Sequence, residues 1–131
     1  MNLPVCDLHC DTALELISPQ KLQRFCRLAH NEGHVDLERG GCLAAYAQFF
    51  AVFTTPDMDP NGVYGPEEIF SAVLHNLLAE IEENERIQLA GTPADAGRIT
   101  QGGKIAAFLS LEGPAGIGFD PGRLEELAAW G

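Results

Sequence analysis

Three apolar segments alternate with helix-like stretches along this chain, and this order constrains the fold more than any other feature of the sequence. Residues 3–10, 43–53 and 104–112 have the length, apolar content and flanking turn residues of β-strands. The near-continuous apolarity of 43–53 is typical of a strand covered on both faces, as in a parallel sheet. We expect helices over 12–17, from Pro19 to Gly33, over 66–88, from a Thr92 cap and Pro93 onward, and from an Asp120 cap and Pro121 up to Gly131. Strands that alternate with helices predict the parallel βα units of an α/β fold.

Side chains that bind metals or move protons stand at the ends of two of these strands. His9 and Asp11 lie at the end of the first strand, and Glu112 closes the third. The carboxyl ends of parallel strands meet at one rim, where α/β proteins bind their ligands. One imidazole nitrogen and two carboxylate oxygens suit Zn²⁺ or a similar divalent ion. Two plainer interpretations stay open at this point: Asp11 as the N-cap of helix 12–17, and Glu112 as an ordinary loop carboxylate.

The alternation of side chains along a strand assigns the other residues of the first segment to faces. Asp7 shares a face with His9, so its carboxylate is a candidate to orient the imidazole from behind. Cys6 and Cys10 fall on the opposite face, and we interpret them as packing residues rather than ligands. The four cysteines form no Cys-x-x-Cys pair, which favours reduced thiols in a cytoplasmic protein.

Length and charge exclude several classes of protein. The chain has 131 residues, 46% of them hydrophobic, which suits a single domain with its own core. Its formal net charge is −11 and its eight lysines and arginines are scattered, so a nucleic-acid partner is not expected. The N-terminus lacks the pattern of a secretory signal, and no apolar run reaches membrane-spanning length. We therefore expect a small-molecule partner, no membrane association and a cytoplasmic location.

Four sequence blocks, in order, resemble the membrane (renal) dipeptidase family of zinc peptidases, in particular its bacterial, non-anchored members. The first is Asp7-Leu8-His9-Cys10-Asp11-Thr12, which is similar to the Asp-x-His-x-Asp start of the family. The others are GHVDLERGG at 33–41, AYAQFFAVF at 45–53 and FLSLEGP at 108–114. The resemblance implies a TIM-like (β/α)8 barrel and hydrolysis of dipeptides, often with a D-residue on the C-terminal side.

The resemblance also implies roles for individual residues. By position, His9 and Asp11 are expected to bind one of two zinc ions, and Glu112 is expected to bridge both as the catalytic carboxylate. Asp7 is the first Asp of the family motif. Gln48 is either a polar residue close to the rim or a satisfied amide of the core.

The chain departs from the family in extent. A (β/α)8 barrel typically needs about 250 residues, and only about three βα units are expected here. The family completes its second zinc site with two histidines from later strands, and His30, His34 and His75 match neither position. The sequence therefore resembles the N-terminal portion of a dipeptidase, residues 1–131 being one partial domain. We expect it to form homo-oligomers or to associate with the missing part of the barrel, because an open sheet leaves strand edges and an apolar face uncovered.

Two alternatives remain at this level. The chain could be a non-catalytic barrel fragment that self-associates and has at most one weak metal site. It could also be a metal phosphoesterase of the polymerase-and-histidinol-phosphatase type, which likewise begins with an Asp-Leu-His strand. That type normally carries His where Asp11 stands, and it lacks the HVDL and SLEGP blocks.

Overall fold

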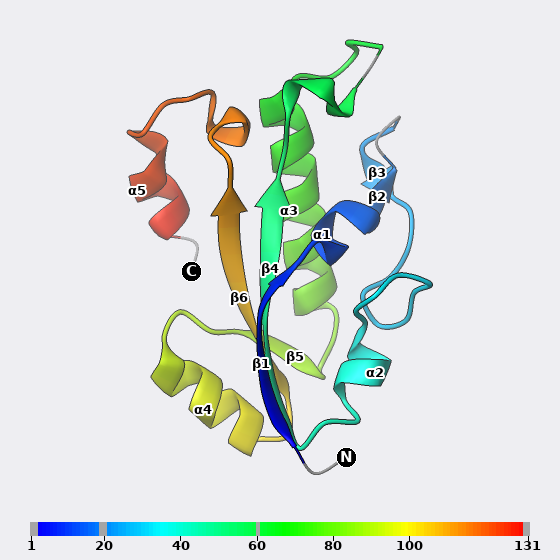
Figure 1. Cartoon of the computed structure of the whole chain (residues 1–131), viewed down its shortest axis with the longest axis vertical. Helices are drawn as coiled ribbons and strands as arrows, with labels where there is room; N and C mark the ends of the chain where they lie inside the picture. Colours follow the sequence, from blue (N-terminus) through cyan, green and yellow to red (C-terminus); the bar gives the residue numbers. More distant parts are fainter. Residues whose placement is uncertain (1–2, 19–20, 60, 130–131) are drawn as a thin grey trace.

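The computed structural model describes residues 3–18, 21–59 and 61–129. Within them, a parallel sheet has the strand order β1-β4-β6-β5 (Figure 1). Its strands are β1 (Pro4–Cys10), β4 (Ala45–Phe53), β6 (Ile105–Glu112) and β5 (Ile87–Leu89). The predicted α/β class and the three predicted strands are confirmed, with ends that shift by one or two residues.

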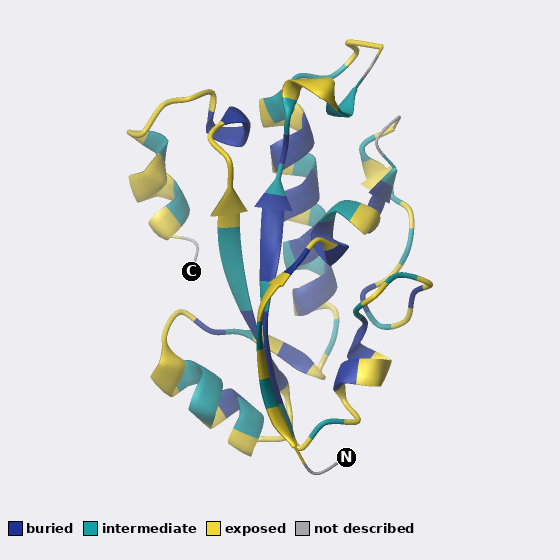
Figure 2. Ribbon diagram, in the orientation of Figure 1, coloured by how far each residue is buried: buried dark blue, intermediate teal, exposed yellow. Residues whose placement is uncertain are grey.

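The sheet is covered on both faces, which explains the apolarity of β4. Phe50 and Val52 belong to the main core, into which helix α3 (Pro66–Glu82) packs its buried residues. Ala47 and Ala106 face the other way and pack against Ile99 of helix α4 (Pro93–Gln101). Figure 2 shows β4 as the most buried strand, whereas the carboxyl end of β6 is exposed. The carboxyl rim of the sheet is therefore exposed to solvent, whereas the centre of the sheet is buried.

The predicted helix over 66–88 is right at its start and too long at its end. Pro66 begins α3, and the Glu68 carboxylate accepts the Gly65 N–H. The helix ends at Glu82, and residues 87–89 form β5, which the sequence did not predict. Ile87 is buried and pairs with Ile105. Residues 87–89 therefore pair with β6 as a strand at the edge of the sheet, although the apolar spacing before them is helical.

The predicted helix from Pro19 to Gly33 is wrong. Short strands β2 (Ile17–Ser18) and β3 (Gln23–Arg24) pair there in antiparallel fashion, and an irregular segment follows; Pro19 itself lies outside the described residues. Long-range contacts explain the difference. Arg24 forms ion pairs with Glu80 of α3 and with Glu83, which follows the helix, and the Leu28 N–H donates to the buried Glu80 carboxylate at 2.7 Å. A continuous helix would use that N–H within itself.

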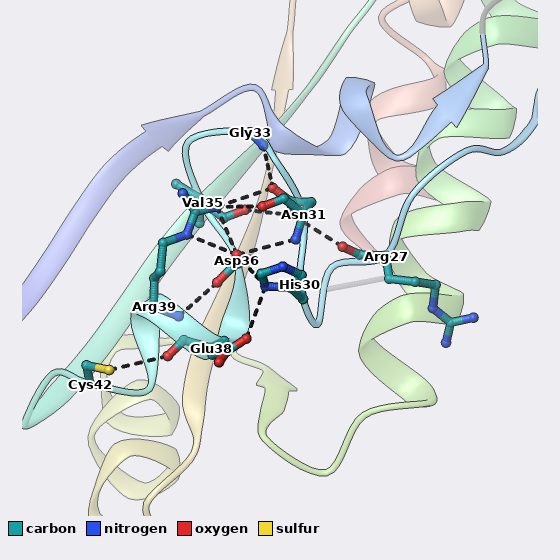
Figure 3. A network of polar contacts seen from close by, with 9 residues as sticks. All are labelled: Arg27, His30, Asn31, Gly33, Val35, Asp36, Glu38, Arg39 and Cys42. Atoms are coloured by element: carbon teal, nitrogen blue, oxygen red, sulfur yellow. Dashed lines mark hydrogen bonds and ion pairs between the residues drawn. The ribbon is translucent and has the colours of Figure 1, made fainter.

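The segment before β4 is held by a buried carboxylate, Asp36, which caps the short helix α2 (Leu37–Gly40). Asp36 accepts hydrogen bonds from the backbone N–H groups of Asn31 and Arg39 and from the Arg39 Nε (Figure 3). Burial alone would raise the pKa of Asp36, but these donors outweigh it and hold the pKa below its ordinary value. The Asp of the HVDL block is therefore a structural anchor.

The sequence predicted N-caps at Thr92 and Asp120, and the structure confirms the first and shifts the second. The Thr92 side chain accepts the Asp95 N–H at the start of α4, with Pro93 first in the helix, as predicted. Helix α5 (Arg123–Ala128) begins later than predicted, because Asp120 accepts the Gly122 N–H and caps the turn before the helix. The predicted stop at Gly131 lies outside the described residues.

Three shorter elements complete the fold. They are α1 (Thr12–Glu15), which follows β1, and the 3-10 turns η1 (Pro56–Met58) and η2 (Ala115–Ile117). Within the described ranges, no helix combines the length and apolarity needed to cross a membrane.

Candidate metal centre

The structure brings His9, Asp11 and Glu112 together at the carboxyl rim of the sheet. The His9 Nε2 lies 3.4 Å from the Asp11 Oδ1 and 3.8 Å from the Glu112 Oε2. One ligand atom from each residue falls within 4.8 Å of the other two, and no other such group of His, Cys, Asp and Glu occurs in the described part of the chain. The side chains are 53%, 60% and 49% exposed, so all three are open to an incoming ligand.

Strand β6 delivers Glu112 as its last residue. Phe49 and Phe108 stack with ring centroids 4.5 Å apart on the face opposite α3. Alternation then places Ser110 and Glu112 on the same side as Phe108. Gly113 follows with a φ of 75°, a left-handed conformation that a residue with a Cβ rarely adopts. This turn ends the strand at Glu112 and leaves its carboxylate at the rim.

Strand β1 delivers His9 through an irregularity that simple alternation does not predict. Asp7 pairs with Gln48, but the next pair is Cys10 with Phe50. Three steps along β1 therefore match two steps along β4, which is a β-bulge with one extra residue. Beyond the bulge, Cys10 lies in the core and His9 is exposed at the rim.

The bulge corrects the expected placement of Asp7. Up to Asp7, the face of β1 that carries Val5 packs towards the core below α3, whereas His9 lies on the opposite side. Asp7 therefore does not stand behind the imidazole. Its carboxylate instead accepts the backbone N–H of His9 at 3.2 Å.

Gln48 lies inside the sheet and is fully buried. Its side-chain amide donates to the carbonyl oxygens of Phe49 and Asp7, and its oxygen accepts the Tyr46 hydroxyl. Burial, and then the negative charge of Asp7, raise the pKa of Tyr46 to about 12, so Tyr46 stays a donor. Gln48 is thus a fully bonded amide of the core that touches β1 at the bulge.

The cysteine predictions had mixed outcomes. Cys10 is buried in the core, and burial raises the pKa of its thiol, which disfavours the thiolate that binds metals. Cys6 is exposed, so its expected packing role is wrong. Cys6 precedes the bulge and lies on the face opposite Val5, whereas Cys10 follows the bulge and packs into the core.

The plainer interpretation of Asp11 receives no support from its contacts. Asp11 occupies the N-cap position of α1, but its side chain makes no capping hydrogen bond. Its carboxylate is directed to His9 instead. Within the described ranges, neither Asp11 nor Glu112 forms an ion pair with a lysine or arginine. Two unneutralised carboxylates beside an imidazole fit a divalent cation, which would balance their charge.

The family model for membrane dipeptidase (peptidase family M19) matches residues 1–131. This chain belongs to the membrane dipeptidase family. Membership of this family removes the phosphoesterase alternative. None of the curated proteins matches the chain.

Solved structures give the same fold. A metallopeptidase from Rhodobacter sphaeroides, liganded with a phosphinate mimic of the dipeptide L-Ala-D-Ala, is 19% identical with a TM-score of 0.74 over 100% of this chain and 44% of that one. The dipeptidase AC, of family M19, is 23% identical with a TM-score of 0.71 over 100% of this chain and 41% of that one. The probable dipeptidase PvdM from Pseudomonas aeruginosa is 19% identical with a TM-score of 0.61 over 92% of this chain and 36% of that one.

This chain is shorter than the solved structures that it matches. It spans less than half of each of these structures. Its parallel sheet is accordingly part of a TIM-like barrel, as the sequence predicted. Its described rim brings one imidazole and two carboxylates together.

Proposed function

We propose that this chain supplies part of the active site of a dipeptidase, in which His9 and Asp11 hold one zinc ion and Glu112 bridges it to a second. The observation that carries the proposal is the convergence of these residues from β1 and β6 at one rim, in a chain of the membrane dipeptidase family. Residues 1–131 would act as one part of a single barrel domain. Ligands for the second ion would come from residues beyond this rim.

The chemistry of the three side chains supports this assignment. The neutral imidazole of His9 offers Nε2, the atom that lies closest to the two carboxylates. Zinc, when bound, lowers the pKa of water and polarises a peptide carbonyl. Asp11 and Glu112 supply the negative charge that keeps a doubly charged ion in an exposed position. Glu112 has two oxygens, so one carboxylate can serve two ions.

The sheet face below the rim is apolar. The apolar surface next to β1 includes Leu8, Phe49 and Phe108 and forms a hollow of about 490 Å³ between the strands and α4. Closure of a barrel over this surface would exclude water from the peptide bond. The phosphinate dipeptide mimic in the Rhodobacter relative supports dipeptides as the substrate class.

The direct test is hydrolysis of dipeptides by the protein as its gene encodes it, reloaded with zinc after chelation. L-Ala-D-Ala and L-Ala-L-Ala are suitable substrates, with tri-alanine as the length control. Asp11→Asn keeps the size of the side chain but removes its charge, and it should lower both zinc content and turnover. Glu82→Gln, the same chemical change on the exposed surface of α3, should alter neither. Equal turnover by the Asp11→Asn variant would refute the proposal.

A further inference from the structure

We propose that Asp7 is a positioning residue for His9: its carboxylate holds the β-bulge that turns the imidazole onto the rim. The part of this proposal that concerns metal rests on the proposed function. The part that concerns the backbone does not, and it has its own measurement.

The position of His9 at the rim depends on the phase of side-chain alternation along β1. If β1 alternated regularly, His9 would share the face of Val5 and Asp7, which packs towards the core. A one-residue change of phase moves a side chain to the other face of a sheet. The extra residue between the Asp7–Gln48 and Cys10–Phe50 pairs makes that change. His9 can reach Glu112 only because of it.

A β-bulge leaves some backbone N–H and C=O groups without a partner in the strand ladder. The His9 N–H lies within the bulge, and the Asp7 Oδ1 accepts it at 3.2 Å. This is the local bond between an Asx side chain and the N–H two residues later that stabilises turns against extended chain. On the other side, the buried Gln48 amide donates to the Asp7 carbonyl at 3.4 Å. Asp7 is therefore bonded through both its side chain and its main chain at the bulge.

The contacts of Asp7 distinguish this role from metal binding. Asp7 is not among the residues whose ligand atoms converge at the rim, as far as the described residues go. Its carboxylate accepts the His9 backbone N–H instead. A role as acceptor needs an oxygen but not a negative charge. Asparagine, which has the same shape and a carbonyl oxygen, should therefore replace Asp7, whereas alanine should not.

The experiment compares Asp7→Ala, Asp7→Asn and the control Cys6→Ala in the protein as its gene encodes it. Cys6 is exposed on the same strand, just before the bulge. Zinc affinity is measured by competition with a chromophoric chelator, and hydrogen exchange of the His9 amide is followed in metal-free protein. Thermal unfolding of each variant shows whether it is folded.

We expect Asp7→Ala to weaken zinc binding about ten- to a hundredfold, the range found when a residue that orients a metal ligand is removed. Exchange of the His9 amide should become several-fold faster in the same variant. Asp7→Asn and Cys6→Ala should retain both the affinity and the protection of the unsubstituted protein. If Asp7→Ala fails to fold, Asp7→Asn alone decides the matter.

Two results would overturn the proposal. Loss of zinc affinity in Asp7→Asn would mean that the charge of Asp7 matters, as for a ligand. Unchanged His9 exchange in Asp7→Ala would mean that the bulge does not depend on this carboxylate. A protein that binds zinc as expected but hydrolyses no dipeptide would contradict the proposed function and leave the role of Asp7 intact.

Discussion

The His9 Nε2 and the Glu112 Oε2 lie 3.8 Å apart, although they come from the first and the last strand of the sheet in chain order. Strand β4 separates β1 from β6, so the two backbones are about 10 Å apart at the rim. The side chains close that gap because both reach towards each other over the carboxyl end of β4. Their convergence depends on the parallel order of the three strands and on where β1 and β6 end.

Removal of the Glu112 charge should affect metal at more than one position. In the protein as its gene encodes it, we expect Glu112→Gln to reduce bound zinc at both sites and to reduce hydrolysis with it, because a bridging carboxylate offsets two cations. His9→Ala should mainly empty one site. Metal content per chain after dialysis and dipeptide turnover are the measurements. Lys104→Ala is the control, because Lys104 is exposed just before β6. If Glu112→Gln retained two zinc ions per chain, Glu112 would not be the bridging carboxylate.

The chain of residues 1–131, prepared alone, should self-associate through the apolar surface beside β1 and show no dipeptidase activity. Leu8 is 71% exposed and borders the hollow that Phe49 and Phe108 line. Sedimentation velocity should find species above the monomer mass. Leu8→Ser should shift them towards the monomer, whereas Val63→Ser, 67% exposed in the loop before α3, should not. A sharply melting monomer of the unsubstituted chain would show that this surface needs no cover.

Asp36→Asn should destabilise the protein in a pH-dependent way. The variant loses the charge that binds Arg39, and we expect a loss of about 2 kcal/mol at neutral pH. Because the pKa of Asp36 is held below its ordinary value, its contribution is complete above about pH 4 and is lost as the pH falls through the folded-state pKa. The gap in unfolding free energy between the two proteins should therefore narrow in acid.

Urea unfolding between pH 7 and pH 3 measures this gap. Glu38→Gln is the control, because Glu38 is exposed and pairs with the exposed His30. Surface pairs of that kind contribute about 1 kcal/mol or less. A gap for Asp36→Asn that stays constant down to pH 3 would mean that the carboxylate is not the titrating group.

Glu80→Ala should be among the most destabilising changes in α3. Glu80 is buried, forms ion pairs with Arg24 and Arg27, and accepts the Leu28 N–H. Alanine would leave that buried N–H without an acceptor, and we expect a loss of about 3 kcal/mol. Glu82→Ala, on the exposed surface of the same helix, should change stability by less than about 0.5 kcal/mol. Equal unfolding midpoints for the two variants would show that Glu80 does not anchor the segment after β3.

Several features of the protein follow from the sequence alone. The three main strands, the cap at Thr92 and the strand-end positions of His9, Asp11 and Glu112 depend on neighbours within a few residues. Apolar runs, turn residues and capping side chains act at that range. The parallel βα order then predicts that strand ends meet at one rim, because all carboxyl ends lie on the same edge.

The tertiary structure decided what local signals could not. Residues 23–33 have a helical pattern, yet Arg24, Arg27 and Leu28 are held by carboxylates of α3 that lie more than fifty positions away. Residues 87–89 form a strand because β6 offers them an open edge. The bulge at His9 is likewise visible only in the register between β1 and β4. In each case the free energy comes from partners distant in sequence, and a chain read residue by residue does not contain their positions.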